Sequence, residues 1–136
     1  MAPVHILNLY SANVMLFVLQ FASFRVDPES GNYTLHLGAF MLGTAGHGGA
    51  CVDTGNMNGM QFTSYDRDND LSGINCASTR HGAWWYNSCD KANFNSILHT
   101  DSTYTENRGI EWDTKRQVIH QTRMQIKPIY VDGIII

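Results

Sequence analysis

Three aspartates alternate with other residues along the segment Asp66–Asp70, which reads Asp-Arg-Asp-Asn-Asp. Carboxylates this close together repel one another, and a bound cation that prefers oxygen ligands removes the repulsion. Ca²⁺ is such a cation, because it accepts carboxylate, carbonyl and water oxygens together. A solvated acidic turn is the other interpretation of this run, and it is the more common one. The run alone leaves both interpretations open.

The acidic run does not match the EF-hand, whose calcium loop has a well-defined sequence. That loop requires Gly at its sixth position and a bidentate Glu at its twelfth. Counted from Asp66, these positions hold Leu71 and Ala77. A calcium site at the acidic run is therefore expected to be of another kind, completed by backbone carbonyl oxygens.

Two cysteines, Cys76 and Cys89, follow the acidic run. A disulfide between them would close a loop of about 14 residues and contribute roughly 3 kcal/mol in the chain-entropy model. Metal ligation by thiolates is the alternative, but it needs a C-x-x-C pair or several nearby histidines. His81 is the only histidine between the two cysteines, so zinc is the weaker interpretation. A disulfide would imply an oxidising compartment.

The aromatic triplet Trp84-Trp85-Tyr86 lies between the cysteines. Successive side chains of a strand point to opposite faces, so the three rings cannot all lie on one side. We expect one face to be covered by core and the other by a ligand or a neighbouring loop. At least two of the three rings are expected to be core residues.

The segments around these motifs predict a chain of short strands and long loops. Strands are expected over residues 17–26, 34–38, 84–86 and 118–129, where apolar residues alternate or cluster between turn residues. Residues 43–59 and 104–108 are expected to be loops, and residues 66–80 a loop with a short helical turn.

Several ordered motifs together resemble the C-terminal globular domain of fibrinogen-related proteins, a family that includes fibrinogen chains, ficolins, tachylectins, tenascins and angiopoietins. In the family's order they are Ser23–Val26, Pro28–Gly38, Gly43–Gly46, Asn58–Thr63, Asp66–Asp70, Asn75–Ala77, Gly82–Tyr86, Cys89, Ala92–Asn95, Gly109–Trp112 and Met124–Pro128. The resemblance implies a partial fibrinogen C-terminal-like domain of the α+β class. Such a domain has a small, mainly antiparallel sheet, long loops, short helices and a calcium loop.

The resemblance also implies which residues would hold calcium. The side chains of Asp68 and Asp70 and the backbone carbonyls of Ser72 and Ile74 fall on the family's calcium ligands. Asp66 becomes a supporting acid. Ca²⁺ is the cofactor that this resemblance implies.

The family's disulfide falls on Cys76 and Cys89, and the peptide bond before the second cysteine, Ser88-Cys89, is expected to be cis. The residues that correspond to the wall of the family's ligand pocket are Arg80, His81, Ser88, Cys89, Asp90 and Tyr104. Arg80 stands where the family commonly has an aromatic residue, and Asp90 where it usually has histidine. These two departures favour a charged or strongly polar ligand over an acetyl group.

The resemblance divides the chain into an apolar leader that does not match (residues 1–19), the partial domain (20–130) and a tail (131–136). The family's N-terminal subdomain has no counterpart. The leader has three interpretations, namely a signal peptide, a buried strand or a replacement leader. Its apolar run, Val14–Phe21, is too short to span a membrane. The odd cysteine, Cys51, indicates a free thiol, a buried reduced cysteine or an intermolecular bond in an oligomer.

Charge and motif order exclude two classes of function. The net charge is −3 and no run of Lys or Arg is present, so nucleic acid has no electrostatic footprint here. The histidines have no Ser-His-Asp or Cys-His order with supporting turn residues such as G-x-S-x-G, so we predict that the chain is not an enzyme.

The expected function is that of a secreted module, stabilised by calcium, that binds glycans or acetylated ligands as a lectin does in innate recognition. One alternative is an extracellular module that binds a receptor or matrix protein. The other is a truncated product without stable function.

Overall fold

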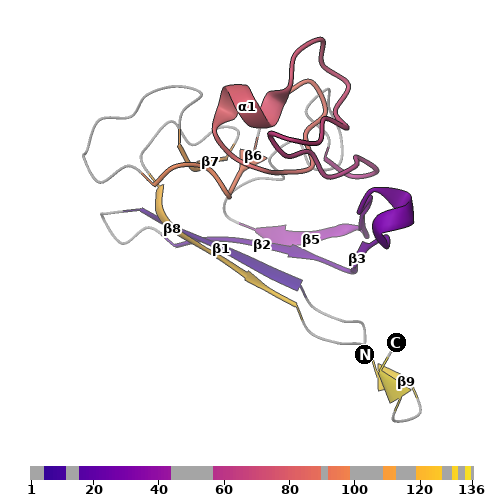
Figure 1. Ribbon diagram of the computed structural model, residues 1–136. Coiled ribbons are helices and arrows are strands. Elements are labelled where there is room, and N and C mark those ends of the chain that lie inside the picture. The colour runs from indigo at the N-terminus through magenta and orange to yellow at the C-terminus, as the bar shows by residue number, and fades with distance from the viewer. Residues whose placement is uncertain are drawn as a thin grey trace.

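Figure 1 shows a computed structural model of the chain, in which residues 5–11, 16–43, 57–89, 92–98, 109–112, 119–126, 130–131 and 134–135 are described. The strands in this part of the chain are β1 (His5–Ser11), β2 (Leu16–Phe21), β3 (Phe24–Val26), β4 (Leu35–Leu37), β5 (Phe40–Gly43), β6 (Ala92–Asn93), β7 (Glu111–Trp112), β8 (Ile119–Gln125), β9 (Tyr130–Val131) and β10 (Ile134–Ile135). The helices there are the 3-10 helix η1 (Glu29–Gly31) and the α-helix α1 (Cys76–Arg80).

Strands β5, β2, β1 and β8 form one antiparallel sheet in that order. β1 lies between β2 and β8, and Leu9 stands opposite Phe17 of β2 and Thr122 of β8. The backbone N–H and C=O groups of β1 therefore have pairing partners on both sides. Residues 5–11 and 16–19 of the region expected to be an apolar leader are strands of this sheet, which is the strand interpretation among the three given for it. The expected boundary after residue 19 falls inside β2.

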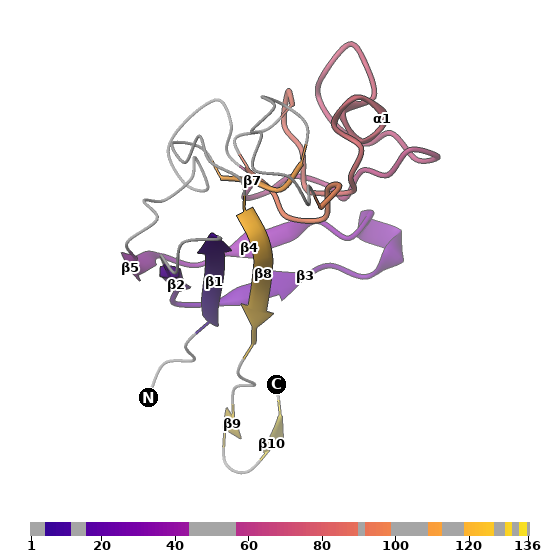
Figure 2. The same ribbon diagram turned by 90° about the vertical axis from the view of Figure 1, so that its left-hand side faces the viewer.

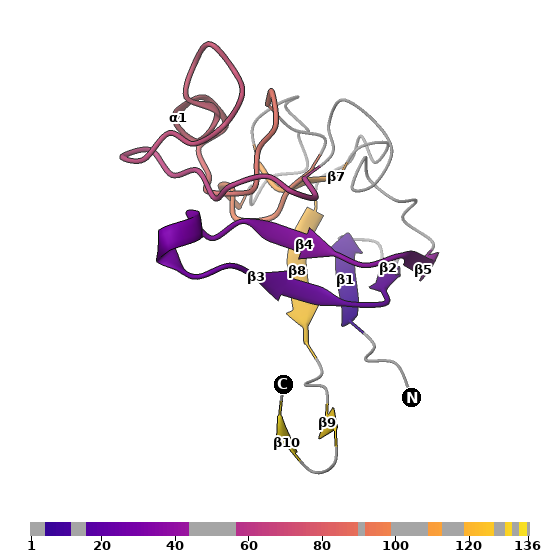
Figure 3. The same cartoon turned by 90° about the vertical axis from the view of Figure 1, so that its right-hand side faces the viewer.

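Strands β2 and β5 continue into β3 and β4 as one long, bent hairpin. Two backbone hydrogen bonds carry the pairing across the bend, from Ala22 N to Ala39 O (2.8 Å) and from Gly38 N to Ser23 O (2.9 Å). A Cβ at Gly38 would lie 2.8 Å from the Ser23 backbone nitrogen, so the bend requires glycine there. In Figures 2 and 3 the β3–β4 end of the hairpin crosses β1 and β8.

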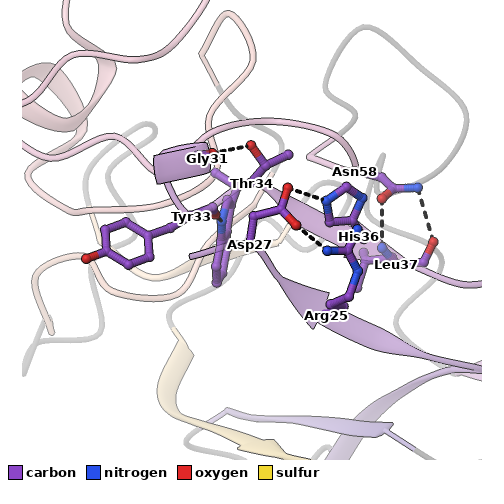
Figure 4. A network of polar contacts seen from close by, with 9 residues as sticks. Arg25, Asp27, Gly31, Tyr33, Thr34, His36, Leu37 and Asn58 are labelled. Carbon is purple, nitrogen blue, oxygen red and sulfur yellow. Dashed lines mark hydrogen bonds and ion pairs between the residues drawn. The ribbon is translucent and has the colours of Figure 1, made fainter. Parts of the chain in front are cut away.

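The β3–β4 hairpin carries a polar network around Asp27 (Figure 4). The Asp27 carboxylate pairs with Arg25, and its Oδ2 atom lies 2.8 Å from His36 Nε2. Arg25 and His36 are register partners in the hairpin, which brings both side chains to the same carboxylate. The hydrogen bond with His36 is the main cause that lowers the pKa of Asp27, and Arg25 lowers it further.

We expect this network to make stability depend on pH in the acid range. A carboxyl whose pKa is lowered by folding stabilises the protein above its unfolded pKa of about 3.9, and this contribution is lost as the pH falls through the folded pKa. Asp27→Asn should therefore lose less stability than the parent between about pH 5 and pH 2. Urea unfolding at a series of pH values measures the difference. Parallel pH profiles for the two proteins would contradict the prediction.

A series of aromatic rings joins the hairpin to strand β7. Trp85 packs edge-on against Phe62 (ring centroids 5.2 Å apart) and Trp84 (5.1 Å). Trp84 then contacts Phe94 (5.1 Å), and Phe94 stacks on Trp112 (5.0 Å). Edge-to-face and offset ring pairs at such distances stabilise beyond the area they bury. The series forms the centre of the core in the described part of the chain.

The aromatic triplet is divided as expected between two environments, but the strand expected over residues 84–86 is wrong, because only Trp84 of the triplet pairs, in an isolated bridge with Thr63. Trp84 and Tyr86 are buried in the core, whereas Trp85 is half-buried. The Trp85 indole nitrogen donates to the backbone oxygen of Tyr33 (2.7 Å), in the turn between β3 and β4. The second face of the triplet is therefore covered by a neighbouring turn.

The other elements lie at two ends of the sheet. In Figure 1, α1 and the two-stranded β6–β7 ribbon lie above the four-stranded sheet, and the β9–β10 hairpin projects at the far end of the molecule from α1. No helix in the described residues is both long and apolar enough to cross a membrane.

Candidate functional site

The acidic loop starts from a short stretch of backbone pairing. Thr63 and Trp84 form an antiparallel bridge, with N–H···O distances of 3.0 and 3.2 Å. Asn69 folds back onto this bridge, because its backbone N–H donates to Thr63 Oγ1 (3.1 Å) and its side-chain Nδ2 donates to Phe62 O (2.7 Å). The loop is thereby fastened to the core beside the aromatic series.

Arg67 turns away from the aspartates and joins the loop to the hairpin. Its Nη2 atom donates to Asn32 Oδ1 (2.7 Å), and its Nη1 atom lies 3.6 Å from Glu29 Oε1. The backbone of the same turn is tied to the start of the loop, since Phe62 N donates to Asn32 O (3.0 Å). The loop therefore rests on the hairpin turn as well as on the core.

Asp70 organises the end of the loop with both carboxylate oxygens. Oδ1 accepts from Ser72 N and Oδ2 accepts from Cys76 N, each at 2.9 Å. Asp68 lies beside it, because Asp68 Oδ1 accepts from Asp70 N at 3.4 Å. Burial raises the pKa of Asp70, and the neighbouring Asp68 charge raises it further, while the two backbone N–H groups lower it.

The donor atoms of this loop fit a hard cation. No group of three or more His, Cys, Asp or Glu side chains that could share a metal ion occurs among the described residues. A cation at this loop would therefore have to be held by the carboxylates of Asp68 and Asp70 together with backbone carbonyls, which is the ligand type that Ca²⁺ takes. Each Asp70 oxygen retains acceptor capacity after its N–H contact, because a carboxylate offers about four lone-pair sites.

Helix α1 follows the loop and has a complete set of caps. Asn75 Oδ1 accepts from Ser78 N (2.9 Å), as a side chain at the N-cap position does. At the other end His81 adopts a left-handed conformation (φ 54°), and its backbone N–H donates to Ala77 O. The backbone N–H of the next residue, Gly82, also donates to Ala77 O (3.2 Å). This short helix is therefore stabilised by its ends rather than by its length.

The first residue of α1 forms the disulfide that the resemblance implied. Cys76 is fully buried and is bonded to Cys89, with the two Cα atoms 5.3 Å apart. The Ser88–Cys89 peptide bond is cis, also as implied. Because Cys76 N contacts Asp70, the disulfide links the acidic loop directly to the Ser88–Cys89 segment.

The expected pocket residues are only partly described. Ser88 is exposed, Cys89 is half-buried, and the carbonyl of Arg80 accepts from Asn93 Nδ2 (3.3 Å) and Ser96 Oγ (2.8 Å). Asp90, Tyr104 and the odd cysteine Cys51 lie outside the described residues.

The structure has an open groove beside α1, with a volume of about 450 Å³. It is lined by Tyr65, Ala77, Ser78, His81, Gly82 and Ala83, so His81 is the one predicted pocket residue in it among those that the structure describes. Sequence reasoning missed Tyr65 and Ser78. The available signal was the spacing of Ser78 and His81, since residues three apart lie on one face of a helix.

Comparison with known proteins decides the family. The family model for the fibrinogen beta and gamma chains, C-terminal globular domain, matches residues 4–129. The chain belongs to this family. The match begins before residue 20 and so includes β1 of this fibrinogen C-terminal domain, in agreement with its place in the sheet.

Relatives and solved structures agree with this assignment. Human Ficolin-3 is 40% identical over 103 residues, which cover 76% of this chain and 33% of Ficolin-3. The mouse fibrinogen gamma chain is 34% identical over 127 residues, covering 79% of this chain and 29% of that protein. The fibrinogen-like globe domain of human ANGPTL2 has a TM-score of 0.82 at 30% identity, covering 93% of this chain and 58% of that domain. This fibrinogen C-terminal chain thus spans about a third of the length of these curated relatives.

The comparisons confirm the predicted family and fold class. Fibrinogen-like domains are recognition modules and not enzymes, so the chain is a non-enzymatic ligand-recognition module.

Proposed function

We propose that the chain is an extracellular recognition module whose acidic loop binds Ca²⁺ and whose ligands are glycans, as in a lectin. The observation that carries the calcium part is the position of Asp70, which holds Ser72 N and Cys76 N while Asp68 lies beside it. The similarity to Ficolin-3 and the exposed segment around Ser88 support the ligand-binding part.

Calcium has a defined structural role in this proposal. The side chains of Asp68 and Asp70 and the carbonyls of Ser72 and Ile74 would hold the ion. A divalent cation there offsets the repulsion between the two carboxylates. It would also hold the loop against Cys76, and through the disulfide against the Ser88–Cys89 segment.

Thermal unfolding with calcium and with EDTA tests the metal site. A ligand that binds only the folded state stabilises it by about 2.7 kcal/mol at a hundred times its Kd, so calcium should raise the Tm by several degrees. Asp70→Asn should abolish that rise. Because this change also weakens a backbone contact, the quantity to compare is the calcium-dependent rise and not the starting Tm.

Asp27→Asn is the matched control, since it removes a carboxylate far from the loop in sequence and should keep the full calcium effect. A folded parent protein with the same Tm in calcium and EDTA would contradict the proposed site. A melt with no cooperative transition in either condition would favour the truncated, unstable product.

Calorimetric titration with acetylated and non-acetylated sugars tests the lectin part. Binding that needs calcium and is lost in Asp70→Asn is the expected result. No heat from any sugar, with folded and calcium-bound protein, would contradict glycan recognition.

An extracellular protein-interaction module is the second candidate. The similarity to the globe domains of human ANGPTL2 and ANGPTL6 favours it, as does Arg80 at a position that is commonly aromatic in the family. A cell-surface protein retained on the immobilised domain, and not displaced by N-acetyl sugars, would support this candidate. Displacement by such sugars would count against it.

A further inference from the structure

We propose that the groove beside α1 is a second ligand site, separate from the calcium loop and the Ser88–Cys89 segment, and that it binds a neutral sugar ring. Its volume of about 450 Å³ falls within the range of pockets that hold small molecules. None of the expected calcium ligands lines it, and neither Ser88 nor Cys89 does.

The side chains of the groove match the two chemical faces of a pyranose. Tyr65 is 79% exposed, so a flat aromatic ring faces solvent at the edge of the groove. A sugar's C–H face can pack on such a ring, whose body is apolar. The hydroxyl of Ser78 and the imidazole of His81 offer hydrogen-bond donors and acceptors for sugar hydroxyls. No Asp, Glu, Lys or Arg is among the described residues that line the groove, which favours a neutral ligand over a charged one.

One side chain, Asn75, holds the two walls of the groove together. Its Nδ2 atom donates to Ser64 O (3.1 Å) and to Tyr65 O (3.4 Å) on one wall. Its Oδ1 atom accepts from Ser78 N (2.9 Å) on the other. The backbones of Tyr65 and Ser78 are therefore held at a fixed spacing before any ligand arrives, which lowers the ordering cost of binding.

His81 occupies a position that favours glycine. Its left-handed conformation (φ 54°) at the end of α1 is uncommon for residues other than glycine, although asparagine, aspartate and histidine adopt it more often than the rest. The imidazole of His81 is exposed and lies at the groove.

The floor of the groove is also constrained. A Cβ at Gly82 would lie 2.7 Å from Asn93 Oδ1 and 3.1 Å from Asn95 O, so glycine lets the groove floor pack against β6. Ala77 and Ala83, which also line the groove, have small side chains. The small floor residues leave the space that Tyr65, Ser78 and His81 surround.

The test is a titration of the full, isotope-labelled chain in calcium, followed by two-dimensional NMR. The probes are methyl glycosides of glucose, galactose and mannose, with glucuronic acid as the charged comparison. We expect at least one neutral glycoside to shift the backbone signals of Tyr65, Ser78 and His81, and to bind more tightly than glucuronic acid.

Two variants separate loss of the site from loss of the fold. Tyr65→Ala should weaken binding about tenfold, since it removes the stacking surface. His81→Gly should also weaken binding but keep or raise the Tm, because glycine suits the left-handed conformation. Leu71→Ala is the control; this exposed side chain is not part of the groove lining and its loss should not change the affinity.

Three outcomes would overturn the proposal. The first is that no neutral glycoside shifts these signals. The second is that Tyr65→Ala and His81→Gly bind as the parent does. The third is that sugars shift signals near Ser88 alone, a result that would support the proposed lectin function while rejecting the groove as a site.

Discussion

Replacing Trp112 with alanine is expected to lower the free energy of unfolding by about 3–5 kcal/mol, the range for removing a large buried aromatic ring. Trp112 is fully buried, and its ring stacks on Phe94 with centroids 5.0 Å apart and planes at 25°. It also forms part of β7, which pairs with Ala92 of β6. The substitution therefore opens a cavity at the end of the aromatic series.

Urea unfolding monitored by far-ultraviolet circular dichroism measures this effect, because the signal does not depend on the removed indole. Domains of this size commonly have only about 5–15 kcal/mol of stability, so Trp112→Ala could lose most of it. Leu98→Ala is the control; this side chain is 51% exposed and its change should stay within about 0.5 kcal/mol. A Trp112→Ala variant within about 1 kcal/mol of the parent would show that the ring is not central to the core.

The division of the aromatic triplet between two environments could be predicted from the sequence, because successive side chains of extended backbone point to opposite sides. The sequence does not indicate which of the three rings lies partly outside the core. Trp85 is half-buried because the turn at Tyr33 and the ring of Phe62 come to it from earlier parts of the chain. Contacts between segments so far apart in sequence leave no local periodicity that would indicate them.

Strand β1 shows the same limit at the level of secondary structure. Its sequence, HILNLYS, lacks a clear polar and apolar alternation, and it falls outside the motifs that resembled the family. It becomes a strand because β2 and β8 pair with it on its two sides. Strand formation depends on such partners more than on intrinsic preference. Pairing with β2 and β8 therefore determines that residues 5–11 form a strand.

For a similar reason, some residues of the candidate site could be predicted from the sequence and others could not. Asp68, Asp70, Cys76 and Cys89 are close in sequence, and their motif indicates their proximity directly. The groove instead joins Tyr65 to Ser78 through the hydrogen bonds of Asn75, whose side chain spans the two walls. An asparagine before a short helix predicts a cap, but it does not predict that the same amide also reaches a second loop.

Removing the disulfide is expected to cost about 3 kcal/mol, because the bridge closes a loop with a sequence separation of 13 residues and so restricts the unfolded chain. The suitable variant is Cys76→Ala with Cys89→Ala. Alanine is preferable to serine, since Cys76 is fully buried and a hydroxyl there would need a partner. Parent and variant should both carry Cys51→Ala, so that thiol exchange with the third cysteine does not confuse the comparison.

Urea unfolding with and without a reducing agent gives the internal control. Reduction should destabilise the parent to the level of the double variant and leave the double variant unchanged. The effect should reach the acidic loop as well, because Cys76 N donates to Asp70 Oδ2 at 2.9 Å and the bridge anchors that residue to Cys89. The rise in Tm caused by calcium should therefore shrink in the double variant. A lost disulfide with an unchanged calcium effect would show that the loop holds its shape through Asn69, Arg67 and the hairpin turn instead.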